Sequence, residues 1–212
     1  MPSTVADIFA AARTSPSGVV PWGTPLPSPR GAGPTTGLYV VALTEDPYGT
    51  SGALATAPVD YAVVDELLTV RPELRLDGAR PTPKQLAARL AGFWFPDEVV
   101  VYVGLAGPRK MPPSGGEVAY RVGEYYKTRL GARSPHAGGW PLKVLSCLND
   151  LHIHFGYCGD VVTAEKRAIG HFDDHVSDDT RAALHDPVRV MPFANLEFPK
   201  GTRKRHGITG AR

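Results

Sequence analysis

Two apolar runs, GLYVVALT at residues 37–44 and DEVVVYVGLAG at residues 97–107, decide the fold of this 212-residue chain. Both runs are short, rich in β-branched and aromatic side chains, and bounded by loop residues, which is typical of buried strands. A third run of the same kind, LHIHFGYC at residues 151–158, follows later in the chain. We therefore expect a small sheet of three strands, antiparallel or mixed, at the centre of the protein.

Between and after these runs, the spacing of apolar residues and the N-cap residues predict helices. The expected helices are residues 59–70, a helix that starts near Thr82 with Pro83 in its first turn, residues 117–131 after a capping box of Ser114 and Glu117, residues 143–148, and residues 164–176 capped by Thr163. This order of elements predicts an α/β fold in which helices flank the sheet. The helical insertion at residues 45–96 is expected to form an accessory lobe.

The two ends of the chain differ from its centre in composition. Residues 1–36 contain a short amphipathic helix and then a Pro/Gly-rich arm, VVPWGTPLPSPRGAGPTT, whose prolines exclude a helix or a central strand. Residues 37–199 are expected to form one domain, because a chain of this length buries a single good core. Residues 200–212 form a basic tail, and the sequence leaves open whether this tail contacts phosphate or is simply solvated.

The overall composition limits the class of protein. Apolar residues make up 42% and charged residues 21%, as in ordinary globular proteins. No stretch approaches the roughly 20 apolar residues of a membrane helix, and the N-terminus lacks the pattern of a secretory signal. With only Cys147 and Cys158, we expect no disulfide framework and a cytoplasmic location. The net charge of +2 gives little indication of a nucleic-acid partner.

Side chains suited to phosphodiester hydrolysis occur on successive expected elements. This reaction needs a group that activates water, a cation that stabilises charge, and a positive side chain that holds the phosphate. Tyr39 lies in GLY on the first strand, and Tyr102 and Gly104 lie in YVG on the second. Arg121, whose planar fork fits phosphate oxygens, lies on the next helix, and Glu165 opens the helix after the third strand.

GLYVV and VVYVGLAG resemble the two halves of the signature of the GIY-YIG nuclease family. As in that family, a helix with an arginine, a strand, a helix with a glutamate and a late asparagine follow, here Asn195 in PFANLE. The resemblance covers about residues 37–195. Two features depart from it: the tyrosines are 63 positions apart (102 − 39) rather than joined by a short hairpin, and Leu38 and Val103 replace the isoleucines.

The resemblance implies a metal-dependent endonuclease that hydrolyses DNA phosphodiester bonds. Tyr39 would be the general base or orient the attacking water, and Tyr102 would be the second tyrosine of the site. Arg121 would hold the phosphate, and Glu165 would bind one divalent metal ion, Mg²⁺ or Mn²⁺. Asn195 would form structural hydrogen bonds near the site.

Other residues are candidates for supporting roles. Family members often carry His or Tyr one turn after the arginine, and either Tyr125 or His136 could fill this position. The loop RSPHAGGWPLK contains a Gly-Gly pair whose backbone can approach a phosphate, although a Gly-rich turn with a buried Trp140 explains it equally well. The candidate DNA-contacting residues are Gly104, Arg133, Lys143, Asn195, Lys200, Arg203, Lys204 and Arg205.

Two other classes of protein remain open. Residues 82–94, TPKQLAARLAGFW, resemble half of a helix-turn-helix, so the insertion and the tail could bind DNA without catalysis. His152 and His154 on a strand, with His171 and His175 on a helix, permit a zinc hydrolase. Because no cysteine or carboxylate completes a convincing zinc set, we favour the nuclease, acting on DNA as a monomer or homodimer with no membrane partner.

Overall fold

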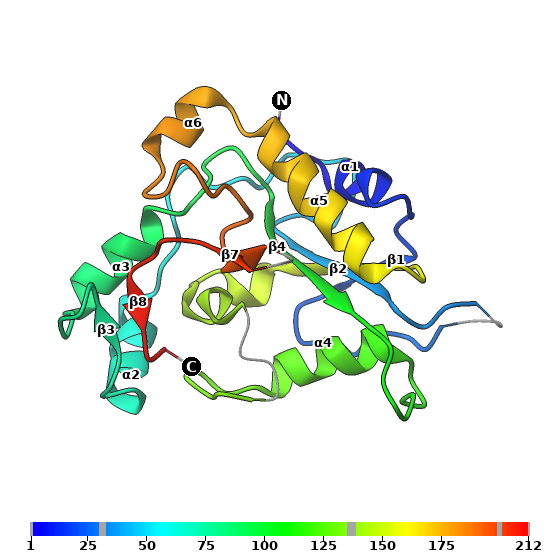
Figure 1. Cartoon of the computed structure of the whole chain (residues 1–212), viewed down its shortest axis with the longest axis horizontal. Helices are drawn as coiled ribbons and strands as arrows, with labels where there is room; N and C mark the ends of the chain where they lie inside the picture. The colour runs from blue at the N-terminus through cyan, green and yellow to red at the C-terminus, as the bar shows by residue number, and fades with distance from the viewer. Residues whose placement is uncertain (1, 30–32, 135–138, 199–200, 212) are drawn as a thin grey trace.

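The computed structural model describes residues 2–29, 33–134, 139–198 and 201–211. It confirms the α/β class, with helices around a sheet of four antiparallel strands in the order β1-β5-β2-β4 (Figure 1). The strands are β1 (Gly18–Pro21), β2 (Gly37–Ala42), β4 (Val100–Ala106) and β5 (His152–Tyr157). The prediction of three strands was therefore wrong by one. The additional strand is the segment GVVP of the Pro/Gly-rich arm, which lies at the edge of the sheet, where a proline is tolerated.

Strand β2 lies inside the sheet, between β5 and β4. All six of its residues are buried, which explains its continuous apolar run. Tyr39 on β2 is paired with Gly104 on β4, and Val41 is paired with Tyr102. This register puts Tyr39 and Tyr102 on the same face of the sheet, because side chains of alternate residues point to the same side.

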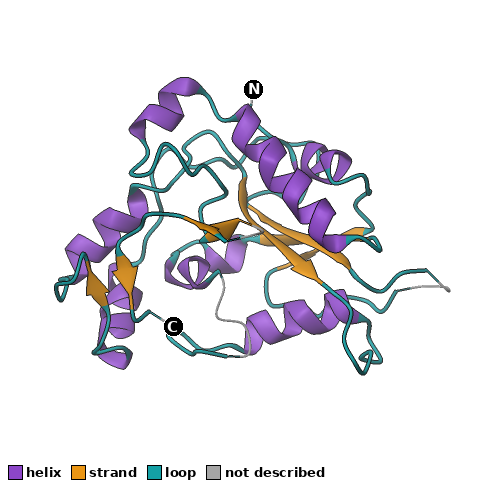
Figure 2. Cartoon of the chain, in the orientation of Figure 1, coloured by secondary structure: helices purple, strands orange, loops and turns teal. Residues whose placement is uncertain are grey.

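The two faces of the sheet are covered by different helices (Figure 2). Helices α1 (Val5–Ala11) and α5 (Val161–His175) pack on the face that carries Leu38. Helix α4 (Glu117–Lys127) packs on the opposite face, which carries Tyr39. The central sheet and the helices on its two faces thus match the α/β fold that the sequence predicts.

The insertion forms a lobe of two helices, α2 (Tyr61–Val70) and α3 (Pro83–Ala91), with the short strand β3 (Arg75–Leu76) between them. Its buried leucines belong to the same core as the Tyr39 face of the sheet. Strand β3 pairs with β8 (Ile208–Thr209), so the C-terminal tail is a part of this lobe. The remaining elements are α6 (Asp178–Ala183), the 3-10 helices η1 (Trp140–Val144) and η2 (Leu148–Asp150), β6 (Glu197–Phe198) and β7 (Thr202–Arg203).

Some helix ends differ from those expected. Thr82 forms the capping box of α3 as its spacing predicts. Ser114 does not cap α4, because Gly116 is the N-cap residue, and the Glu117 carboxylate accepts a hydrogen bond from the Thr35 hydroxyl instead. Helix α5 is capped by Asp160 rather than by Thr163. The single helix expected at residues 143–148 is replaced by η1 and η2.

Two observations bear on the composition arguments. Cys147 and Cys158 are both free thiols. In the part of the chain that the structure describes, no helix is long and apolar enough to cross a membrane.

Candidate functional site

Tyr39 and Tyr102, distant in sequence, are in direct contact. Their ring centroids are 5.9 Å apart, and their hydroxyl groups are hydrogen-bonded to each other. The pairing of β2 with β4 creates this contact, because it sets each tyrosine on the same face of neighbouring strands. The insertion at residues 45–96 therefore does not prevent the two strands from meeting.

Gly104 makes the contact between the tyrosines possible. A Cβ atom at this position would lie 2.4 Å from Cζ of Tyr39 and 2.7 Å from Cε1 of Tyr102. Both distances are far below van der Waals contact, so only glycine lets the two rings lie over the strand. Gly104 thus has a packing role beneath the rings, and its contact with substrate stays a prediction.

Tyr125, on α4, extends the tyrosine pair. Its ring centroid is 5.7 Å from that of Tyr102, and its hydroxyl donates a hydrogen bond to the carbonyl oxygen of Gly139. A Cβ atom at Gly139 would lie 3.1 Å from Cε2 of Tyr102, so the Tyr102 ring is packed between Gly104 and Gly139. The other candidate for this position, His136, lies outside the described residues.

Glu165 and Arg121 lie beside Tyr102 on helices from opposite faces of the sheet. Burial raises the pKa of the Glu165 carboxyl to about 7, although Arg121 acts in the opposite direction. Burial first, and then the negative charge of Glu165, raise the pKa of Tyr102 to about 12. Tyr102 and Arg121 therefore interact with each other and with both Tyr39 and Glu165.

The burial of the tyrosines bears on the role expected for Tyr39. Tyr39 is 0% exposed, and burial raises the pKa of its phenol well above the ordinary value. A general base must lose its proton and reach the water that it activates, and Tyr39 meets neither condition here. Tyr102, which is 8% exposed, is the member of the pair nearer to solvent.

Two charged residues that the sequence analysis missed complete the polar part of this cluster. The Glu124 carboxylate forms ion pairs with Arg121, at 3.2 Å, and with Arg109, at 2.7 Å. Arg109, Arg121 and Glu117 line a cavity of about 260 Å³ next to the loop that follows β4. The signal for Arg109 was the basic segment PRK at residues 108–110, directly after the second strand of the signature.

Asn195 forms the structural hydrogen bonds that its place in the resemblance implies. Its side-chain oxygen accepts from the Val103 amide at 2.9 Å, and its side-chain nitrogen donates to the Val103 carbonyl at 2.7 Å. The Ala194 amide also donates to Val101. These bonds cover the free edge of β4 next to Tyr102. With its amide buried in this way, Asn195 supports the site and does not face substrate.

Lys143 and Arg133, which were expected to contact the phosphate, both form contacts within the protein. Lys143 donates hydrogen bonds to the carbonyl oxygens of Tyr125 and Thr128, which satisfies the last turn of α4. Arg133 lies 3.5 Å from the Glu73 carboxylate, at the end of the accessory lobe. Lys143 thus lies beside the tyrosine cluster, with its Nζ atom 5.6 Å from the centroid of the Tyr125 ring, whereas Arg133 does not reach the cluster.

The basic tail is folded, so it is not simply solvated, which was one of the two alternatives. Lys204 is buried and donates to the carbonyls of Pro192 and Phe193 at 2.8 and 2.9 Å. Arg203 is exposed and paired with Glu197, and Arg205 is also exposed. Lys200 lies outside the described residues. The tail therefore contributes to the fold first, and only part of its charge faces solvent.

The histidines of the zinc alternative do not form a site. His154 is buried and its Nε2 atom lies 2.8 Å from the Thr44 carbonyl oxygen. His171 and His175 stack on each other, with ring centroids 3.8 Å apart, while His152 belongs to β5. Within the described ranges, no group of three His, Cys, Asp or Glu side chains could hold a metal ion.

Comparison of the chain with models of protein families, with curated proteins and with solved structures found no match. The resemblance to the nuclease family therefore rests on the residues described above.

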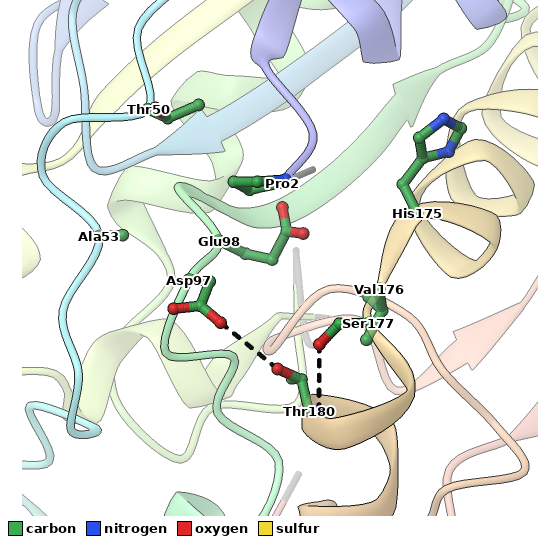
Figure 3. A pocket seen from close by; sticks show the side chains of 9 residues that line it. All are labelled: Pro2, Thr50, Ala53, Asp97, Glu98, His175, Val176, Ser177 and Thr180. Atoms are coloured by element: carbon green, nitrogen blue, oxygen red, sulfur yellow. Dashed lines mark hydrogen bonds between the residues drawn. The ribbon is translucent and has the colours of Figure 1, made fainter.

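A second cavity, of about 370 Å³, lies where the chain enters β4 and is lined by Asp97 and Glu98 (Figure 3). Asp97 and Ser177 are hydrogen-bonded to Thr180 at one wall. Glu98 is buried beside them, and its carboxylate accepts a hydrogen bond from the Ser3 amide at 3.0 Å. Burial, together with the negative charge of Asp97, raises the pKa of Glu98 to about 7.

Replacing Glu98 by Gln should make the protein more stable at pH 8 but not at pH 4. The unfolded chain releases the Glu98 proton near pH 4.5 and the folded chain near pH 7, so stability falls as the pH rises between these values. The loss is up to about 3 kcal/mol and is complete above pH 7. Gln removes this loss and can still accept from Ser3. Denaturant unfolding at both pH values measures the effect, and an identical pH dependence in the two proteins would contradict it.

Proposed function

We propose that this protein is a metal-dependent endonuclease that hydrolyses DNA phosphodiester bonds. One observation carries the proposal. Tyr39, Tyr102, Arg121 and Glu165 come from four different elements, and all of them interact with Tyr102 or with each other. A set selected from short sequence motifs has no reason to form one cluster if each residue serves an unrelated structural purpose.

Glu165 is the residue that would hold the divalent cation, Mg²⁺ or Mn²⁺. Glu165 is half-buried, and among the described residues no Lys, Arg or His forms an ion pair with it. A cation would offset the cost of ionising this half-buried carboxyl. Mg²⁺ is commonly bound by one or two carboxylates together with waters and substrate phosphates, so a single glutamate fits. The cation would supply positive charge to the phosphate and to the leaving oxygen.

Arg121 and Arg109 would bind the phosphate oxygens. Both guanidinium groups line the cavity of about 260 Å³, and both are about one-third exposed. In the absence of DNA they share the Glu124 carboxylate, which keeps them at one place and limits their loss of side-chain freedom on binding. A phosphate that approaches this pair would form charge-assisted hydrogen bonds with both.

The two tyrosines would divide the roles that were expected of Tyr39. Tyr102 is the phenol beside Glu165, and it would orient the attacking water by hydrogen bonding, since its pKa of about 12 disfavours loss of its own proton. Tyr39 would hold the Tyr102 hydroxyl in place through the hydrogen bond between the two phenols. DNA as the partner and the cytoplasm as the location belong to the same proposal, as does a monomeric or homodimeric state.

Incubation of the purified protein with supercoiled plasmid tests the proposal. We expect nicked or linear DNA with Mg²⁺ or Mn²⁺ and intact plasmid with EDTA. The Tyr102→Phe variant should cut more slowly, because the ring still packs between Gly104 and Gly139 but has no hydroxyl to orient water. Binding of DNA without any cleavage under these conditions would instead identify a non-catalytic DNA-binding protein.

A further inference from the structure

A groove of about 730 Å³ lies beside the proposed phosphate site. It runs between residues 23–26 of the N-terminal arm, residues 113–115 of the loop after β4, and the outer side of α4. Its lining is mostly apolar, with Tyr120 on the wall and Gly123 on α4. A volume of this size is typical of sites for small organic groups.

Tyr120 and Arg109 connect the groove with the phosphate site. Tyr120 is 46% exposed, and Cζ of Arg109 lies 4.3 Å from the centroid of its ring. Arg109 also lines the smaller cavity and pairs with Glu124, which itself lines the groove. The ion pair between Arg109, which lines the smaller cavity, and Glu124, which lines the groove, therefore joins the two sites.

Gly123 keeps the floor of the groove open. Glycine is unfavourable inside a helix compared with alanine, because it loses more backbone freedom on folding. A Cβ atom at Gly123 would meet no atom within 4 Å, so close packing does not explain the glycine. Its effect is to leave the surface of α4 flat between Tyr120 and Lys127, both of which line the groove.

We propose that this groove binds an unpaired base of the DNA substrate, with the phosphate of the same strand in the neighbouring site. The inference rests on the proposed function and adds a substrate class to it: DNA that contains a single-stranded segment or a displaced nucleotide. An aromatic ring with a guanidinium stacked on it offers a platform for a base, and the apolar lining suits the face of a base.

The charges around the groove favour this occupant. Arg109, Arg121 and Lys127 are positive, and the one carboxylate of the groove, Glu124, is already paired with both arginines. This arrangement can follow a phosphate backbone while a base enters the groove. In a regular duplex each base is covered on both faces by its neighbours, so only an unpaired or flipped base can stack on Tyr120.

Binding of oligonucleotides in EDTA tests the inference without cleavage. The probe is a single strand of about 12 nucleotides, within the usual range of site sizes, with 2-aminopurine at one position, compared with the same strand in a perfect duplex. We expect tighter binding of the single strand and quenching of the 2-aminopurine fluorescence. Tyr120→Ala should weaken binding of the single strand about 5- to 150-fold, whereas Tyr120→Phe should retain both affinity and quenching.

A matched pair of variants at Gly123 tests the groove independently of Tyr120. Gly123→Ala should keep the affinity, because its Cβ enters open space, whereas Gly123→Phe should fill the groove and weaken binding of the single strand as Tyr120→Ala does. Equal affinity of all four variants, or no preference for the single strand, would overturn the inference. The cleavage assay tests the proposed function separately. If the plasmid stays intact while binding of the single strand depends on Tyr120, the nuclease activity is refuted but the assignment of the groove as a base-binding site is supported.

Discussion

Replacing Glu165 by Gln should abolish metal-dependent cleavage of DNA while the protein remains folded. The substitution removes the only carboxylate beside Tyr102 that the proposal assigns to the cation, and loss of the cation should lower the rate by several orders of magnitude. Burial raises the pKa of this carboxyl to about 7, so its ionised form is disfavoured in the fold. A neutral Gln should therefore not lower stability above pH 7.

A second measurement separates loss of the cation from other causes of inactivity. Mg²⁺ that binds the folded wild-type protein should raise its melting temperature, and the same addition should not change that of Glu165→Gln. Affinity for DNA in EDTA should be similar in the two proteins, because Glu165 does not hold the phosphate in this proposal. Cleavage and thermal shift thus report the same loss by independent means.

Glu98→Gln is the matched control for this experiment. Glu98 is another glutamate whose pKa is raised to about 7, but it lies in the cavity where the chain enters β4, which no tyrosine lines. Its replacement should leave cleavage and the Mg²⁺ response unchanged. If Glu165→Gln cuts DNA at the wild-type rate, the assignment of the cation is wrong, and Glu117 and Glu124 become the carboxylates to test.

The sequence was sufficient to predict the central strands and the contact between Tyr39 and Tyr102. Strands β2 and β4 are nearly continuous apolar runs, and β5 is a short segment rich in aromatic and β-branched residues, so their local composition can be read directly. The two tyrosines meet because adjacent pairing of β2 and β4 survives the long insertion between them. The resemblance of GLY and YVG to the two halves of the signature implied this pairing, because it puts both tyrosines in one site.

Features that depend on distant partners could not be predicted in this way. Ser114 has the spacing of a capping residue, but the Glu117 carboxylate bonds with Thr35, far away in the sequence. Lys204 looks like a solvated cation in a basic run, yet its ammonium group is buried and donates to the carbonyls of Pro192 and Phe193. In both cases a tertiary contact outweighs the local pattern.

The same limit explains why the role of Tyr39 had to be revised. A tyrosine in a strand can face solvent or the core, and the signature alone does not distinguish the two. The structure covers this side of the sheet with α4, so Tyr39 is buried and only Tyr102 approaches the surface. Glu124 shows the opposite case, because its i,i+3 spacing from Arg121 could have indicated an ion pair on α4 from the sequence.

Replacing Gly104 by Ala should lower stability and eliminate cleavage together. The φ angle of Gly104 is not in the left-handed region, so alanine introduces no backbone strain, and the whole effect is steric. Its Cβ would lie 2.4 Å from Cζ of Tyr39 and 2.6 Å from the Tyr39 hydroxyl oxygen, in a core without space for the ring to move. Overpacking of this kind costs about 1–3 kcal/mol and displaces side chains.

Two comparisons make the Gly104 result specific to the tyrosine pair. Gly123→Ala adds the same methyl group where no atom lies within 4 Å, and it should be neutral or stabilise the protein by up to about 1 kcal/mol through helix propensity. Adding Tyr39→Leu to Gly104→Ala removes the two closest clashing atoms, Cζ and the hydroxyl oxygen of Tyr39, although Cε1 of Tyr102 remains 2.7 Å from the new Cβ. The double variant should therefore lose less stability than the sum of the single variants, as a double-mutant cycle measures. It should still be inactive, because Tyr102 loses the phenol that holds its hydroxyl. Wild-type stability and cleavage in Gly104→Ala would show that the two tyrosine rings do not pack over β4. The proposed site would then lack the contact between Tyr39 and Tyr102 on which it is built.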